Sequence, residues 1–171
     1  MSKDPIEKER LNEDREKGRK REITFCGLMQ KYKCFTYRFQ EGHPKAAVLE
    51  CQDKYILLPD VWVVREDGQN FFAEVKEKYP TKYGDYGLEE YRVFSLIKIS
   101  DLTKTPVLYV IYDTRDREWY CANIKTLISK AYKNFWSKTY VCGEVKKLPV
   151  YYFQKAWFKE IEKDGELWVD D

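Results

Sequence analysis

Residues 57–77, LPDVWVVREDGQNFFAEVKEK, decide how this chain folds. Apolar and aromatic residues lie on both sides of an Asp67-Gly68 pair, which is typical of two β-strands joined by a tight turn. The same strands carry Asp60, Glu74 and Lys76 among Val, Trp, Phe and Ala residues. Because buried charge is costly without a partner, these three residues need an explanation.

The strand periodicity places Glu74 and Lys76 on one face, since alternate side chains of a strand point the same way. The face of Asp60 depends on the turn. A two-residue turn sets position 60 opposite 75 and directs Asp60 away from Glu74. A three-residue turn with Gly68 in the left-handed conformation sets position 60 opposite 74. Only the longer turn gathers both carboxylates and the ammonium group.

Such a group of side chains has a chemical use. Two neighbouring carboxylates repel each other unless a cation lies between them, and Mg²⁺ takes oxygen ligands. A nearby lysine can orient a metal-bound water or stabilise negative charge on a phosphate. The alternative is a solvated edge strand, on which each surface ion pair contributes about 0.2–1 kcal/mol. Pro59 and its apolar neighbours favour a central strand pair, and therefore metal-assisted phosphodiester hydrolysis.

Pro59-Asp60, followed by a hairpin and Glu74-Val75-Lys76, resembles the motif of the PD-(D/E)XK nuclease superfamily. The resemblance covers residues 18–124, and its layout is similar to that of archaeal Holliday junction resolvases. It implies a restriction-endonuclease-like α/β fold, in which a central mixed β-sheet is flanked by helices in the order α-β-β-β-α-β. It also implies that Asp60, Glu74 and the Val75 carbonyl bind Mg²⁺, for which Mn²⁺ substitutes, and that Lys76 assists catalysis.

Further site residues follow from the same resemblance. Many members carry another acid on the first helix and a Gln, Tyr or Lys on the helix after the ExK strand. Glu22 matches the first position and Tyr91 the second, while Glu50 is a weaker match for the acid. His43 lies upstream of the Pro-Asp, as in viral cap-snatching endonucleases, although its EGHPK context is typical of an exposed loop histidine. RNA therefore stays open as a substrate.

Two other features have simpler interpretations. A second Glu-Val-Lys occurs at 144–146 without an upstream Pro-Asp hairpin, between Gly143 and Pro149, and we interpret it as a surface turn. Asp113 follows a nearly continuous apolar segment, and we interpret it as the residue that ends a buried strand.

The rest of the chain predicts a mixed α/β domain. Helices are expected over 5–30, with a break near Gly18, over 88–100 and over 125–136. Strands are expected over 33–40, 105–113 and 117–124, with extended chain over 46–64 and a loop over 79–87. We divide the chain into a charged arm (1–17), the nuclease core (18–124) and a basic aromatic extension packed on the core (125–171).

Charge distribution is more informative than net charge. The 31 Lys and Arg residues nearly balance the 29 Asp and Glu residues. Residues 121–160, however, contain eight lysines and two acids with aromatics interleaved. Lysines neutralise phosphates and exposed aromatics stack on unpaired bases, although these aromatics could equally form core. The candidate phosphate contacts are Lys17, Arg19, Lys20, Arg21, Lys133 and Lys138.

Composition also excludes several classes of protein. Five scattered cysteines and one histidine predict reduced thiols rather than a zinc site or a disulfide framework. No apolar run reaches the length of about 20 residues that spans a bilayer, and the N-terminus is too charged for a secretory signal. We expect a cytoplasmic protein with a nucleic-acid partner, DNA before RNA. Many related nucleases dimerise, so a homodimer stays open for this chain. A non-catalytic binding module on the same fold is the alternative.

Overall fold

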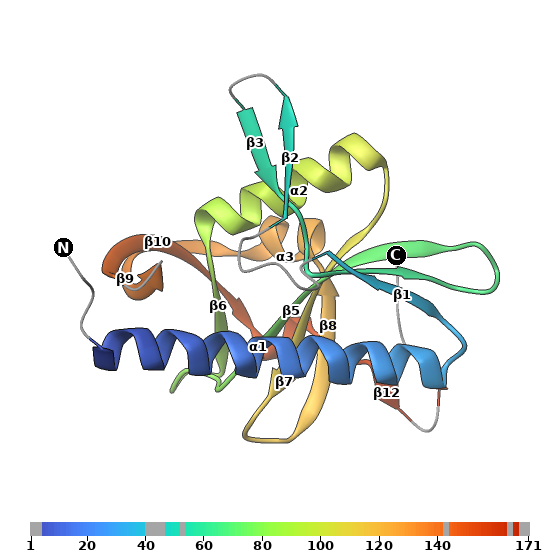
Figure 1. Ribbon diagram of the computed structural model, residues 1–171, viewed down its shortest axis with the longest axis horizontal. Coiled ribbons are helices and arrows are strands. Elements are labelled where there is room, and N and C mark those ends of the chain that lie inside the picture. Colours follow the sequence, from blue (N-terminus) through green and yellow to red (C-terminus); the bar gives the residue numbers. More distant parts are fainter. Residues whose placement is uncertain (1–4, 40–46, 52–53, 142–143, 164–165, 168–171) are drawn as a thin grey trace.

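The computed structural model describes residues 5–39, 47–51, 54–141, 144–163 and 166–167. Its centre is a six-stranded mixed sheet with the strand order β1-β4-β5-β7-β8-β11 (Figure 1). These strands are β1 (Phe35–Arg38), β4 (Val61–Val64), β5 (Asn70–Lys78), β7 (Val107–Asp113), β8 (Glu118–Asn123) and β11 (Lys159–Glu160). Strands β5 and β7 are parallel and the other neighbours antiparallel. The fold is thus the mixed α/β class that the sequence predicts. His43 lies outside the described residues.

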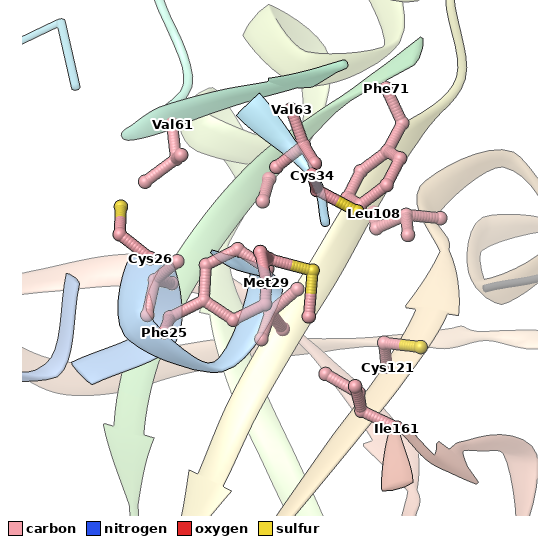
Figure 2. Close-up of a cluster of buried hydrophobic side chains, with 13 residues drawn as sticks. Phe25, Cys26, Met29, Cys34, Val61, Val63, Phe71, Leu108, Cys121 and Ile161 are labelled. Atoms are coloured by element: carbon pink, nitrogen blue, oxygen red, sulfur yellow. The ribbon is translucent and has the colours of Figure 1, made fainter. Parts of the chain in front are cut away.

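Helix α1 (Pro5–Lys31) covers one face of this sheet. Figure 2 shows Phe25 and Met29 of the helix lying over the sheet, among Val61, Val63 and Leu108. This apolar layer forms because the helix turns one stripe of residues inward while β4, β5 and β7 present every second side chain. The layer fixes α1 against the strands that carry the charged residues.

The opposite face is covered by α2 (Glu90–Thr103), α3 (Ile124–Lys130) and a second sheet of order β6-β10-β9. The strands of the second sheet are β6 (Asp85–Glu89), β9 (Tyr132–Val141) and β10 (Glu144–Gln154). Strand β7 supplies Tyr109 and Ile111 to this second core and Leu108 and Val110 to the first. It is therefore buried on both faces, as its apolar sequence predicts.

The remaining elements are short. Strands β2 (Val48–Cys51) and β3 (Lys54–Leu57) pair and project from the body beside α2 (Figure 1). Strand β12 (Glu162–Lys163) pairs with β13 (Glu166–Leu167). A 3₁₀ turn, Lys155–Trp157, follows β10.

The hairpin between β4 and β5 has the longer of the two predicted turns. Val61 pairs with Ala73, and the N–H of Arg65 donates to the carbonyl of Gln69 at 2.8 Å. Three residues therefore form the loop, with Gly68 at φ +84°. Glycine is favoured here because a Cβ in the left-handed region collides with the backbone.

Four local predictions are wrong. Helix α1 runs through Gly18 without a break. Residues 85–89, assigned to a loop and a helix start, form β6. The last predicted helix ends at Lys130, and the chain continues as β9. The second Glu-Val-Lys begins strand β10 rather than forming a turn. In the last three cases pairing between β6, β10 and β9 supplies backbone hydrogen bonds that local sequence does not reveal.

Asp113 ends β7, as predicted, and also ties the second sheet to the first. Its buried carboxylate accepts hydrogen bonds from the Tyr86 hydroxyl at 2.6 Å and from Lys155 Nζ at 2.8 Å. Burial would raise the pKa of Asp113, but the bonds from Lys155 and Tyr86 lower it to about 2. The Asp113 carboxylate therefore links the two sheets.

The structure also describes three of the cysteines and the helices of the chain. Cys26, Cys34 and Cys121 have buried side chains. Among the helices of the described part of the chain, none is long and apolar enough to cross a membrane.

Candidate active site

Asp60, Glu74 and Lys76 meet at the end of the β4–β5 hairpin. Lys76 Nζ lies 3.2 Å from Asp60 Oδ2 and 2.7 Å from Glu74 Oε1. The two carboxylates are buried, with 3% and 0% of their residue surface exposed, whereas Lys76 is half-buried. The prediction that the longer turn gathers these three side chains is confirmed.

A backbone irregularity presents Asp60 to β5. The N–H of Asp60 donates to the carbonyl of Ala73, the residue that also pairs with Val61. Asp60 and Val61 thus both oppose Ala73 of β5, as in a β-bulge. Beyond this point the Asp60 carboxylate takes the place of a backbone partner, because its Oδ2 accepts a hydrogen bond from Val75 N–H at 2.9 Å.

Arg92 of α2 completes the cluster. Its Nε donates to Glu74 Oε1 at 2.8 Å and its Nη2 donates to Glu74 Oε2, so the guanidinium holds both oxygens of one carboxylate. Nη2 also donates to the carbonyl of Leu58 at 2.7 Å and lies 3.9 Å from Asp60 Oδ1. Only 7% of Arg92 is exposed. The buried charges are therefore balanced, two acids against two bases.

The pKa values of the four groups reflect this balance. Burial would raise the pKa of Glu74, but the charges of Arg92 and Lys76 lower it to about 2. Burial raises the pKa of Asp60, and repulsion from Glu74 adds to the effect. Burial alone would lower the pKa of Lys76, yet the charges of Asp60 and Glu74 hold it above its ordinary value. Lys76 is accordingly an ammonium group at neutral pH.

Glu22 reaches the same region from α1. Burial raises its pKa to about 7, and the negative charge of Asp60 contributes further. The charges of Lys76 and Arg38 act in the opposite direction. The helix thus brings a third carboxyl group within electrostatic reach of the buried pair, at the position that the sequence predicts for an acid of the first helix.

The donor set suits a hard divalent cation. Carboxylate and carbonyl oxygens are the ligands that Mg²⁺ prefers. Since the N–H and C=O of a strand residue point to the same side, the Val75 carbonyl faces the edge where Asp60 lies. Within the described ranges, however, no three acidic, His or Cys side chains stand at metal-binding separations. Asp60, Glu74 and the carbonyl are the residues that could hold the ion, with Glu22 approaching from the helix.

The basic residues of α1 border a groove on the helix side of the sheet. Lys17, Lys20 and Arg21 line an open groove together with Ile23, Thr24 and Glu77. Arg21 is engaged in an ion pair with Glu77 and packs 3.9 Å from the ring centroid of Tyr112. Lys17 and Lys20 are exposed.

Other predicted residues are placed elsewhere. Arg19 is exposed on α1. Glu50 is exposed on the projecting strands β2 and β3, so it does not join the buried pair. Lys133 and Lys138 lie on β9, and their side chains are outside the described residues.

The sequence interpretation missed Arg92 and chose its neighbour Tyr91. Tyr91 is 46% exposed, and the next residue of α2, Arg92, contacts the Glu74 carboxylate. The signal was the phase of the helix, because Arg92 lies four residues before Leu96 and seven before Ile99, both of which are fully buried. An arginine on the apolar stripe of a helix indicates a buried acid opposite it.

Aromatic side chains continue the same face of the sheet beyond the carboxylates. Tyr37, Trp62 and Phe72 stand side by side on β1, β4 and β5. Phe72 lies two residues before Glu74 and therefore shares its face. Phe39 links the rings, with centroids 5.4 Å from Tyr37 and 6.0 Å from Phe72. Tyr37 is 59% exposed, so this row of rings is open to solvent.

Comparison with solved structures identifies the fold. The chain is similar to Hjc, a Holliday junction resolvase from Archaeoglobus fulgidus, with a TM-score of 0.53, 12% identity, and coverage of 81% of this chain and 89% of that one. It also matches D212, a nuclease from a fusellovirus, with a TM-score of 0.45, 13% identity, and coverage of 84% and 86%. The likeness to Hjc shows a shared α/β fold, as the layout of the sequence predicts. No model of a known protein family matches the sequence, and no curated protein does.

Proposed function

We propose that this protein is a divalent-metal-dependent endonuclease that hydrolyses phosphodiester bonds of nucleic acid, DNA in preference to RNA. The observation that carries the proposal is the buried Asp60–Glu74 pair with Lys76 Nζ in contact with both carboxylates. A contribution to stability does not explain two buried acids on neighbouring strands, because the free-energy cost of removing the charges from water is as large as the free energy gained from ion pairing.

The residues have distinct roles in this proposal. Asp60, Glu74 and the Val75 carbonyl hold Mg²⁺ or Mn²⁺, with Glu22 as a further ligand. The bound ion supplies Lewis acidity and lowers the pKa of an attacking water. Lys76 contacts both carboxylates, and its ammonium group donates to the scissile phosphate and stabilises its negative charge.

Two surfaces support nucleic acid as the substrate. The groove of Lys17, Lys20 and Arg21 offers cations to a phosphate backbone. The row of Tyr37, Trp62 and Phe72 lies on the face that carries Glu74, and exposed rings stack on unpaired bases. Tyr91, Arg19, Lys133 and Lys138 are proposed as further contacts. The division into arm, core and extension, and a homodimeric assembly, also belong to the proposal.

The second candidate is a binding module without catalysis. It is favoured by Arg92, because this guanidinium already neutralises Glu74. The two candidates differ in one measurable respect: an endonuclease loses its cleavage activity with Lys76, whereas a module has no activity to lose.

Labelled linear, branched and single-stranded DNA and a structured RNA should be incubated with the protein in Mg²⁺, Mn²⁺ or EDTA. We expect metal-dependent cleavage by the native protein and by Lys98→Ala, which alters an exposed lysine of α2. Lys76→Ala should reduce cleavage by about 10²-fold or more. Nucleic-acid binding without cleavage in either metal would favour the module, and the ranking of substrates separates DNA from RNA.

A further inference from the structure

Arg92 places a positive charge beside both carboxylates of the proposed metal centre. Its guanidinium contacts both oxygens of Glu74, and Nη2 lies 3.9 Å from the nearer oxygen of Asp60. A fixed bond to the Leu58 carbonyl holds the group in place from α2. The fork of an arginine matches a carboxylate in two hydrogen bonds, so it binds Glu74 more firmly than a single-point donor would.

The charge balance makes this placement consequential. Asp60 and Glu74 supply two negative charges, and Lys76 and Arg92 supply two positive ones, in contact and largely out of water. A divalent cation that enters this cluster meets carboxylates that are already neutralised. It must share Glu74 with Arg92 and must also approach the positive guanidinium at short range.

We propose that Arg92 is a resident counter-ion that competes with the divalent cation and weakens its binding to the Asp60–Glu74 pair. The inference rests on the proposed function, because it concerns the same metal centre. Arg92 is a positioning residue that acts through Glu74. The consequence is a metal centre that binds its ion more weakly than two buried carboxylates would alone.

Metal affinity tests the inference directly. Mn²⁺ binding should be measured by titration calorimetry, without nucleic acid, on the native protein, Arg92→Gln and Arg92→Lys. Glutamine keeps hydrogen-bonding capacity but removes the charge, and we expect Mn²⁺ to bind about tenfold more tightly. Lysine keeps the charge but loses the two-point contact with Glu74, and we expect an affinity between those of the native protein and Arg92→Gln. Arg65→Gln, which removes a surface arginine of the β4–β5 turn, should leave the affinity unchanged.

Several outcomes would overturn the inference. If folded Arg92→Gln binds Mn²⁺ no more tightly than the native protein, Arg92 does not compete with the ion. If this variant is unfolded in EDTA, its circular dichroism should regain the folded signal on addition of Mn²⁺, and failure to do so would also exclude competition.

The same titration separates this inference from the proposed function. Native protein that binds Mn²⁺ and cleaves, beside an Arg92→Gln variant of equal affinity, refutes only the role of Arg92. Absence of Mn²⁺ binding by all variants refutes the metal centre itself and the inference with it.

Discussion

Asp60 accepts a hydrogen bond from the N–H of Val75 at 2.9 Å, at the point where the backbone pairing of β4 and β5 ends. The carboxylate therefore has a structural task in addition to the proposed metal contact. We expect Asp60→Asn, which can still accept this bond, to fold and to lose cleavage activity by about 10²-fold or more. Asp60→Ala leaves the Val75 N–H unpaired, and the free energy of unfolding should fall by about 1–3 kcal/mol.

Chemical denaturation and the nuclease assay check this pair of variants. Equal stability of Asp60→Asn and Asp60→Ala would show that the hydrogen bond contributes nothing. Full activity of Asp60→Asn would exclude Asp60 from the metal centre.

The positive φ of Gly68 gives a prediction about the turn. In Gly68→Ala the left-handed conformation should lower the free energy of unfolding by about 1–2 kcal/mol. Gly68→Asn is the matched control, because asparagine tolerates this region, and it should cost less than alanine. Denaturant titration of both proteins checks the order. If alanine is as stable as glycine, the loop has adopted another turn, and the contact of Lys76 with both carboxylates should be lost too.

Glu22 makes stability depend on pH in the metal-free protein. Its pKa is about 7 in the folded state against an ordinary value of 4.5, so between these values the folded chain holds a proton that the unfolded chain has released. Stability should therefore fall as pH rises from 4.5 to 7. Glu22→Gln cannot ionise. The melting temperature of this variant in EDTA, relative to that of the native protein, should therefore increase as pH rises from 4.5 to 7.

Thermal unfolding at several pH values measures that difference. Glu16→Gln alters an exposed acid of the same helix and serves as the control, with a difference that stays constant. A constant difference for Glu22→Gln as well would show that burial and the charge of Asp60 do not raise the pKa of Glu22.

The exposed ring of Tyr37 predicts how the protein binds single strands. Tyr37→Ala should weaken the binding of a single-stranded oligonucleotide about fivefold or more, since stacking contributes about 1–3 kcal/mol per base. Tyr83→Ala removes a tyrosine that is 76% exposed, against 59% for Tyr37, and that lies far along the chain from the row of rings. Fluorescence anisotropy in EDTA, at fixed salt, compares the two without cleavage. Equal affinities of Tyr37→Ala and Tyr83→Ala would show that this face of the sheet does not bind the oligonucleotide.

The central features of the fold were predictable because they depend on local pattern. Strand alternation placed Glu74 and Lys76 together, and the choice of turn reduced the position of Asp60 to two alternatives. Arg92 was not predictable by the same means, because its role depends on the phase of α2 and on residues 18 positions away. Strands β6, β9 and β10 were missed for a related reason. Tyr132, Phe135 and Trp136 fit a helical spacing as well as a strand, and distant pairing decides between them.

The order of pairing in the sheet has a consequence for folding during synthesis. Hairpin β4–β5 joins near neighbours in the chain, so the segment that carries Asp60 and Glu74 can form as soon as it leaves the ribosome. Strand β8, by contrast, waits for Lys159 and Glu160 of β11 before both its edges are paired. Until then the nascent chain exposes an open strand edge, a surface on which chains associate. The buried acids are thus assembled early, and the sheet that shelters them is completed late.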